Sequence, residues 1–287
     1  MLAELKELYR FRELLWILVL RDLKVRYKNS ALGFAWSLIN PAVQVAVISF
    51  VVKNFIKMDV PNLSAYIFCA FLPWSFFQLA LLDTSHSLIV NERLMKKVYF
   101  PREIIPLSLV LSNLIHLLLA ILVFLVYLLL WVQAPLLPTM ALIPFLILIE
   151  LLLITGLSLV ISAVSVFYED VKYLMTVLLQ VLYFAVPVMY FVEHVKNSTP
   201  NRNSHGLLFE VYMLNPLVTI LTALRTWMLE PLYLPLPSLD KTHIIVVRTS
   251  DHVPMSYLLF TTVVSLAVAI GGYALFNRMK WSFVERP

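Results

Sequence analysis

The stretch RDLKVRYKNSALGFAWSLINPAVQVAVISFVV, Arg21 to Val52, joins a dense positive cluster to a long apolar run. Its cations are Arg21, Lys24, Arg26 and Lys28, and the run that follows them contains Asn40, Pro41 and Gln44. Lys and Arg collect at the cytoplasmic ends of transmembrane helices, which need about 20 consecutive apolar residues. The stretch therefore predicts a membrane-spanning helix that begins near residue 32.

The composition extends this prediction to the whole chain. Of 287 residues, 61% are hydrophobic and 14% are charged, whereas soluble domains have about 45–50% apolar and about 25% charged residues. The lone Cys69 excludes a disulfide framework and a cysteine metal site. The net charge of +5 comes from cations at the ends of apolar segments, so we expect no nucleic-acid partner.

Six apolar segments are long enough to cross a bilayer. They lie at residues 32–52, 64–89, 104–132, 140–167, 173–192 and 256–276. Helix is the expected conformation, because a lone lipid-exposed strand leaves its backbone groups unsatisfied. We predict an all-α integral membrane protein with one domain over residues 1–287, in which residues 193–255 form an external loop and residues 277–287 a cytoplasmic tail.

The positive residues predict the orientation. Most of the 22 Lys and Arg residues lie before the first span, between the second and third spans, between the fourth and fifth spans, and after the last one. Both termini are therefore expected in the cytoplasm. In the N-terminal segment 1–28, Leu8, Phe11, Leu15 and Leu18 recur at helical spacing opposite Lys6, Arg10 and Glu13. This pattern predicts an amphipathic helix in the membrane interface.

Polar side chains inside spans are costly and tend to face a cavity or a partner. Glu150 and His116 are compatible with a proton relay, although pairing with a neighbouring helix is the simpler interpretation. Phe71, Trp74 and Gln78 share one helical face, as do Tyr183 and Tyr190 of the fifth span. Such aromatic and amide groups suit sugar rings, but interfacial belts and ordinary packing explain them equally well.

The sequence has no Walker A motif, no GxSxG, no HExxH and no close carboxylate pair inside a span. We therefore expect neither enzyme activity nor nucleotide hydrolysis. The connection NERLMKKVYFPREIIP, residues 91–106, predicts a short basic helix closed by Pro101. It suits either docking to a soluble partner or a positive-inside loop without a partner.

Five motifs in order resemble the membrane subunit of bacterial polysaccharide-export ABC transporters, which export O-antigen, teichoic acid and capsule. They are RDLKVRYKNSALGFAWSLINP, LMKKVYFPREIIP, FYEDVKYL, LQVLYFAVPVMY and LNPLVTILTALR. The resemblance implies the type-two ABC exporter transmembrane fold, with six transmembrane helices per subunit and an N-terminal interface helix. It also implies a homodimer in the bacterial cytoplasmic (inner) membrane, bound to two copies of a cytoplasmic ABC ATPase that holds the ATP and Mg. The substrate would be an undecaprenyl-linked glycan, and this chain itself would bind no cofactor.

The resemblance also assigns candidate residues. Contacts to the ATPase would come from Asn91, Arg93, Lys96, Lys97, Tyr99 and Arg102, and from Glu169, Asp170 and Lys172. Membrane lipids and the substrate headgroup would meet Arg21, Lys24, Arg26 and Lys28. The channel between subunits would be lined by Asn40, Gln44, Phe71, Trp74, Gln78, Gln180, Tyr183 and Tyr190.

One region departs from the family pattern, and other functions stay open. Residues 231–255 are long and proline-rich, with a possible short strand pair at His243–Arg248, while residues 207–230 would supply re-entrant helices. An ABC exporter of a drug or lipid is one alternative. A secondary transporter driven by Glu150 and His116 would be expected to contain internal repeats, which the six dissimilar spans lack. An intramembrane enzyme lacks clustered acidic residues for Mg²⁺ or a general base.

Overall fold

The structure is a computed structural model that describes residues 2–26, 36–54, 62–198, 200, 203–237, 244–249 and 253–280. Among these residues, four helices are long and apolar enough to cross a membrane, or five if the bent pair described below counts as one span. They are α4 (Leu63–Thr84), α7 (Ile104–Tyr127, continued by the π-turn η2, Leu128–Val132), α8 (Ile143–Ser165, preceded by the 3₁₀ turn η3, Pro138–Leu142) and α14 (Met255–Met279). These four correspond to the second, third, fourth and sixth predicted spans.

The first and fifth predicted spans are shorter than the others. They appear as α3 (Trp36–Asn54) and α9 (Val171–Ala185). The fifth was expected to reach residue 192, but α9 ends at Ala185 and Val186 is extended. Pro187 explains this end, because a residue that precedes proline is disfavoured in the helical conformation.

The second span also ends before its predicted boundary at residue 89. Helix α4 stops at Thr84, and the four-residue α5 (Ser87–Val90) follows after a turn. At this end the hydroxyl of Thr84 donates to the carbonyl of Ala80 (2.8 Å) and that of Ser85 donates to Leu82 (2.7 Å). Short polar side chains that bond to nearby backbone groups favour helix ends.

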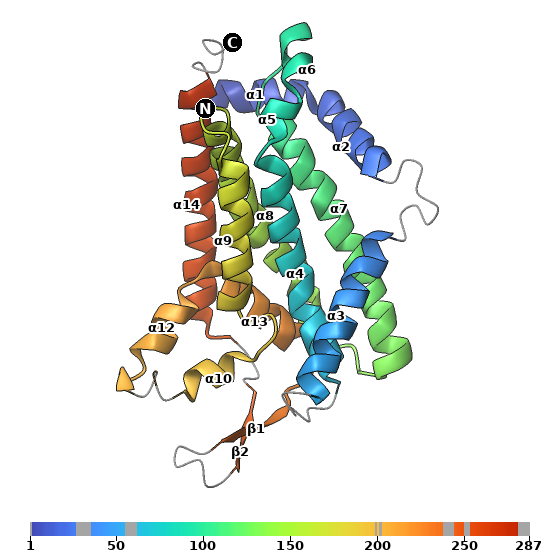
Figure 1. Ribbon diagram of the computed structural model, residues 1–287, viewed down its shortest axis with the longest axis vertical. Helices are drawn as coiled ribbons and strands as arrows, with labels where there is room; N and C mark the ends of the chain where they lie inside the picture. The colour runs from blue at the N-terminus through green and yellow to red at the C-terminus, as the bar shows by residue number, and fades with distance from the viewer. Residues whose placement is uncertain are drawn as a thin grey trace.

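Helix α1, which begins at Leu2, and the last turn of α14, which ends at Met279, lie at the same end of the bundle, which we call the terminal end (Figure 1). It carries α1 (Leu2–Arg10), α2 (Arg12–Arg26), α5 and α6 (Glu92–Lys97). The opposite end, the hairpin end, carries α10 (Val192–Lys196), α12 (Leu207–Met213), α13 (Pro216–Met228) and two strands. Strand β1 (Tyr233–Pro237) pairs antiparallel with β2 (Ile244–Arg248).

Helices α12 and α13 meet at an angle of 85°, which is the geometry of a broken span or a re-entrant loop. The turn between them is defined by Asn215 and Pro216. The Asn215 side chain accepts a hydrogen bond from the Leu217 amide (3.1 Å), and Pro216 occupies the first turn of α13. Asparagine before a helix and proline at its first position are both favoured, because they suit the unpaired amides of a helix start.

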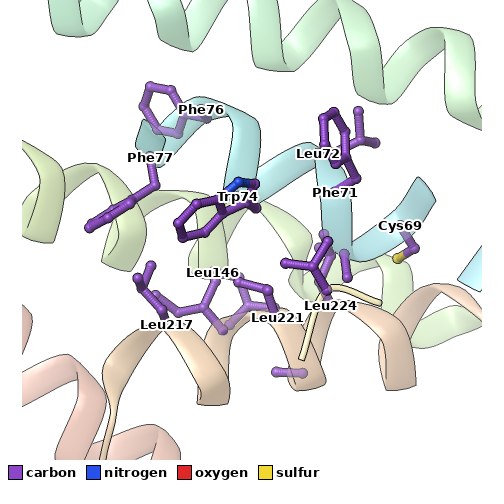
Figure 2. Packing of buried hydrophobic residues seen from close by; sticks show 14 of the residues in the cluster. Cys69, Phe71, Leu72, Trp74, Phe76, Phe77, Leu146, Leu217, Leu221 and Leu224 are labelled. Carbon is purple, nitrogen blue, oxygen red and sulfur yellow. The ribbon is translucent and has the colours of Figure 1, made fainter. Parts of the chain in front are cut away.

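The core forms where α4 packs against α13 and α8. Figure 2 shows Trp74 and Phe77 of α4 facing Leu217 and Leu221 of α13 and Leu146 of α8. The Trp74 side chain is fully buried (0% exposed). Helix α13 therefore supplies apolar surface to the centre of the protomer, although it lies far from α4 in the sequence.

Helices α8 and α14 approach each other backbone to backbone. A Cβ atom placed on Gly156 would lie 2.3 Å from the carbonyl oxygen of Val268, and one on Gly272 would lie 2.3 Å from that of Gly156. Glycine at such crossings lets membrane helices pack closely. The crossing is therefore specified by these two glycines.

The N-terminal segment is helical, as predicted, but it is divided into α1 and α2 at Phe11. Leu18 is buried, and Leu8, Phe11 and Leu15 pack with it against a second apolar cluster at the terminal end. That cluster includes Phe100, Ile104, Tyr273 and Phe276. The apolar face predicted from the sequence thus packs on the protein, while Lys6, Arg10 and Glu13 are exposed.

Candidate functional site

A polar cluster joins α2 to α4 and α7 at the terminal end. The Arg26 guanidinium forms an ion pair with Asp83 of α4, and both side chains are about three-quarters buried. The Asn113 side-chain amide of α7 donates to the same carboxylate oxygen, Oδ2 (2.8 Å). His116, one turn further along α7, is close enough to Arg26 and Asp83 to interact electrostatically with both. The sequence analysis singled out Arg26 and His116, but it gave no signal for Asn113 within its Leu-rich helix.

A second contact ties α2 to the corner between α5 and α6. Arg21 donates through Nη2 to the side-chain oxygen of Asn91 (3.2 Å), and the same nitrogen lies 3.1 Å from Asp22. Asn91 in turn donates to the carbonyl of Ser87 (2.9 Å), the first residue of α5. Arg21 was predicted to meet a headgroup and Asn91 to meet an ATPase, and the structure brings these two residues together.

These contacts border a cavity of about 450 Å³, which we call the α2 pocket. Its lining includes Arg21, Arg26, Asp83, His86 and Asn91. A second cavity of about 340 Å³, the α9 pocket, is lined by Ser85, His86, Ile89, Val90, Glu169 and Lys172. His86 and Val90 line both cavities. The short α5 segment therefore separates the predicted headgroup residues from the predicted second ATPase contact.

Helix α6 presents a basic surface at the terminal end. Arg93, Lys96 and Lys97 are exposed, while Leu94 and Met95 pack inward against the second apolar cluster. After the helix, Tyr99 is 85% exposed. We call Arg93, Lys96, Lys97 and Tyr99 the α6 surface. A large exposed aromatic side chain among cations is typical of protein-binding surfaces.

Arg102 lies apart from the α6 surface. Its Nη1 donates to the carbonyl of Lys280 (3.0 Å), just after the last residue of α14. The Lys280 ammonium lies 3.9 Å from the buried carboxylate of Glu103. A cation that donates to the carbonyls at a helix C-terminus is stabilising. Arg102, predicted as an ATPase contact, is therefore placed to hold the end of α14. Asp170 precedes the first residue of α9 and is exposed.

The predicted channel residues occupy different environments. Phe71 and Trp74 are buried in the core of the protomer, so in this conformation neither reaches a surface. Trp74 donates to the Gln78 side chain (3.1 Å), and its ring centroid lies 5.6 Å from that of Tyr183. Lys28 and the Asn40 side chain lie outside the described residues. Tyr190 is half-buried, and its hydroxyl lies 2.9 Å from that of Tyr212.

Helices α3 and α9 leave most of their surface uncovered, with α4 between them (Figure 1). On α9 only Met175 and Leu179 are buried, whereas Thr176 and Gln180 are exposed. On α3, Gln44 is exposed. Exposed amides at membrane depth are costly when they face lipid. These two helices therefore present surfaces suited to a partner or to a water-filled path.

Sequence reasoning missed the role of Arg225 on α13. Its guanidinium donates to the carbonyls of Tyr66 (3.0 Å), Tyr190 (2.9 Å) and Val188 (2.7 Å). It thereby connects α13 with α4 and with the connection that follows α9. An isolated arginine at the end of an apolar helix is the signal that was available, because a buried guanidinium needs several acceptors.

Glu150 is buried in α8, and its Oε1 has no hydrogen-bond partner in the described part of the chain. His116 belongs to the polar cluster on α7. The described residues contain no group of three or more His, Cys, Asp or Glu side chains that would hold a metal ion. The chemistry of the site is thus that of charged and amide side chains around two cavities.

Comparisons with known proteins agree with this architecture. Residues 13–229 match the family described as ABC-2 type transporter. The chain is 26% identical over 273 residues to the O-antigen export system permease protein RfbA of Klebsiella pneumoniae, a match that covers 95% of this chain and 94% of the relative. It is 30% identical over 223 residues to the protein of the same name from Myxococcus xanthus, covering 78% of this chain and 83% of the relative. The chain belongs to the ABC-2 type transporter family, as a multi-pass membrane permease homologous to those of O-antigen export.

Proposed function

We propose that this protein is the membrane subunit of an ATP-driven exporter that moves a lipid-linked polysaccharide across the bacterial inner membrane. Two copies form the channel, and two copies of a separate ATPase bind at the terminal end, which faces the cytoplasm. The names of the relatives support a polysaccharide substrate. The cations Arg21, Lys24 and Arg26 at the terminal end support an anionic headgroup, because positive charge attracts it over a distance of about 10 Å at moderate ionic strength.

The uncovered surface of α3 and α9 is the observation that supports the proposed homodimer. Both helices are apolar enough to lie in the membrane, yet they expose Gln44, Thr176 and Gln180. A second copy of the chain would cover these groups or enclose them in an aqueous channel. Helix α4 lies between α3 and α9. Gln78 of α4 and Tyr183 of α9 are partly exposed, so both belong to the same proposed channel lining.

Cross-linking tests the dimer. In a Cys69→Ala background, Gln180→Cys is expected to give a covalent dimer with a bifunctional maleimide in native membranes, because α9 would face its counterpart. Val263→Cys is the matched control, since Val263 is an exposed apolar residue of α14 that is expected to face lipid. The products are measured by gel electrophoresis. Dimer from Val263→Cys and none from Gln180→Cys would contradict the proposed interface.

The α6 surface is the proposed docking site for the ATPase. The combined change Lys96→Ala, Lys97→Ala and Tyr99→Ala is expected to weaken ATPase association at least about tenfold, since exposed aromatic and cationic anchors at interfaces often contribute more than about 1.4 kcal/mol together. The measurement is the amount of a co-expressed candidate ATPase subunit that co-purifies with this chain, together with the rate of ATP hydrolysis.

The matched control for this experiment is Trp131→Ala, because Trp131 is 81% exposed but lies near the hairpin end of α7. Arg102→Ala is a second comparison. We expect it to lower thermal stability through the end of α14 while leaving ATPase association largely intact. Normal ATPase association by the triple variant would exclude the α6 surface as the docking site.

A further inference from the structure

The α2 pocket has the size and the side chains of a small-anion site. Its volume of about 450 Å³ falls within the range of about 300–1,000 Å³ that is usual for ligand pockets. Two guanidinium groups from one helix, Arg21 and Arg26, line it together. Paired arginines bind phosphoryl groups well, because each planar fork donates two parallel hydrogen bonds to two oxygens.

Both arginines are held by partners within the chain that a ligand would be able to replace. Arg26 contacts Asp83, and Arg21 contacts Asn91 and Asp22, in each case through Nη2. A guanidinium has five N–H donors, so these contacts use only part of its capacity. A phosphoryl anion offers more acceptor oxygens than the amide of Asn91, and it brings the negative charge that Asp83 now supplies.

The released partners have other contacts to retain them. Asp83 keeps the hydrogen bond from Asn113 (2.8 Å), and Asn91 keeps its own to Ser87 (2.9 Å). The loss of Arg26 therefore does not leave the Asp83 carboxylate without a donor. An anion is therefore able to bind Arg21 and Arg26 in place of Asn91 and Asp83, while Asn91 and Asp83 each keep one hydrogen bond within the chain.

From this geometry we propose that the α2 pocket binds a phosphoryl anion, which displaces Asp83 from Arg26 and Asn91 from Arg21. Asn91 stands at the junction of α5 and α6, so the exchange frees the corner that carries the α6 surface. His86 and Val90 line both cavities, so the exchange is also expected to alter the α9 pocket, which is lined by Glu169 and Lys172. This last step, from an occupied pocket to the ATPase, rests on the proposed function; the binding site itself does not.

Binding is tested on the purified subunit alone, by isothermal titration with inorganic pyrophosphate at low ionic strength. Asp83→Asn is expected to tighten binding about tenfold, because it removes the competing charge from Arg26 without changing the side-chain shape. The double variant Arg26→Gln with Asp83→Asn is expected to lose binding. It leaves no unpaired charge, so its fold should be retained, as thermal unfolding would verify.

Lys6→Gln is the matched control, since it removes one exposed cation of α1 away from the pocket. Unchanged affinity in Asp83→Asn, or wild-type affinity in the double variant, would overturn the proposal. The source of the phosphoryl group is then identified in nanodiscs, where undecaprenyl pyrophosphate and cardiolipin are compared as competitors of pyrophosphate. Displacement by the first points to a substrate headgroup, displacement by cardiolipin points to a structural lipid, and displacement by neither argues against a membrane ligand in this pocket.

The two proposals fail separately. If pyrophosphate binds as described but no ATPase associates with the α6 surface, the exporter mechanism fails and the anion site stands. If the ATPase associates normally but pyrophosphate does not bind, only the anion site is wrong. When both hold, the phosphoryl lipid is expected to change the rate of ATP hydrolysis by the complex, and Asn91→Ala is expected to reduce that response.

Discussion

Gly156→Ala is expected to destabilise the protein by more than about 3 kcal/mol, although the change adds a single methyl group. Overpacking against side chains typically costs about 1–3 kcal/mol, because side chains are able to move aside. Here the new Cβ would lie 2.3 Å from the carbonyl oxygen and 2.5 Å from the carbonyl carbon of Val268, which belong to the backbone of α14. The two helices would have to separate along their shared crossing.

Gly271→Ala provides a matched control one position from the crossing on α14. A Cβ at Gly271 meets nothing within 4 Å, and alanine is favoured over glycine in a helix by about 1 kcal/mol. This variant is therefore expected to be as stable as the wild type or slightly more stable. Gly272→Ala is expected to resemble Gly156→Ala, since its Cβ would lie 2.3 Å from the Gly156 carbonyl oxygen.

The measurement is thermal unfolding of the purified subunit in detergent, with the yield of monodisperse protein as a second readout. Similar stability of the Gly156→Ala and Gly271→Ala variants would show that the crossing between α8 and α14 adjusts freely. In that case close backbone packing would not be the feature that fixes these two helices.

The long apolar helices were predictable because their signal is local. Composition and length were sufficient to identify α4, α7, α8 and α14, and proline and hydroxyl side chains account for the boundaries that differed. Burial at Trp74 was not predictable, because helical spacing shows that Phe71, Trp74 and Gln78 share a face but not what that face meets. The answer depends on α13, which lies far away in the sequence and folds back beneath α4 (Figure 2).

The polar site was likewise predictable only in its local features and not in its contacts between helices. Charge patterns singled out Arg21 and Arg26 individually, but the pairing of Arg26 with Asp83 depends on how α2 lies across α4. Arg102 illustrates what local sequence leaves out, because its position in a basic connection suggested a partner but gave no sign that its guanidinium reaches the end of α14. Local sequence identifies which groups are charged, and tertiary packing decides which of them remain available to a ligand.

Arg225→Met is expected to cost about 3–5 kcal/mol of stability, because it removes the donor from three backbone carbonyls, and a buried polar group left without its partner costs about 1–3 kcal/mol. Arg225 is 6% exposed and donates to three backbone carbonyls. Its guanidinium also lies 5.4 Å from the ring centroid of Phe191. Methionine keeps much of the volume, so the expected loss comes from the unpaired carbonyls of Tyr66, Val188 and Tyr190 rather than from a cavity.

Arg225→Lys separates charge from geometry in the same experiment. A lysine retains the positive charge but not the planar fork that reaches three separate carbonyls, so we expect it to recover only a minor part of the lost stability. Arg12→Met, at an exposed cation of α2, is the control and is expected to have little effect. Thermal unfolding gives the stability, and limited proteolysis between residues 197 and 206 reports whether α12 and α13 still pack against α4.

Water is a possible replacement partner for the three carbonyls in the Arg225→Met variant, and the size of the adjoining cavity limits how much it can contribute. The cavity beside Arg225 has a volume of about 30 Å³, which is room for one or two water molecules, since each needs at least about 10–15 Å³. A single water donates two hydrogen bonds, whereas Arg225 donates three from a fixed fork and adds its charge. Near-wild-type stability of Arg225→Met would therefore mean that α13 shifts to open a larger wet cavity, and the proteolysis pattern would change even though the unfolding temperature did not.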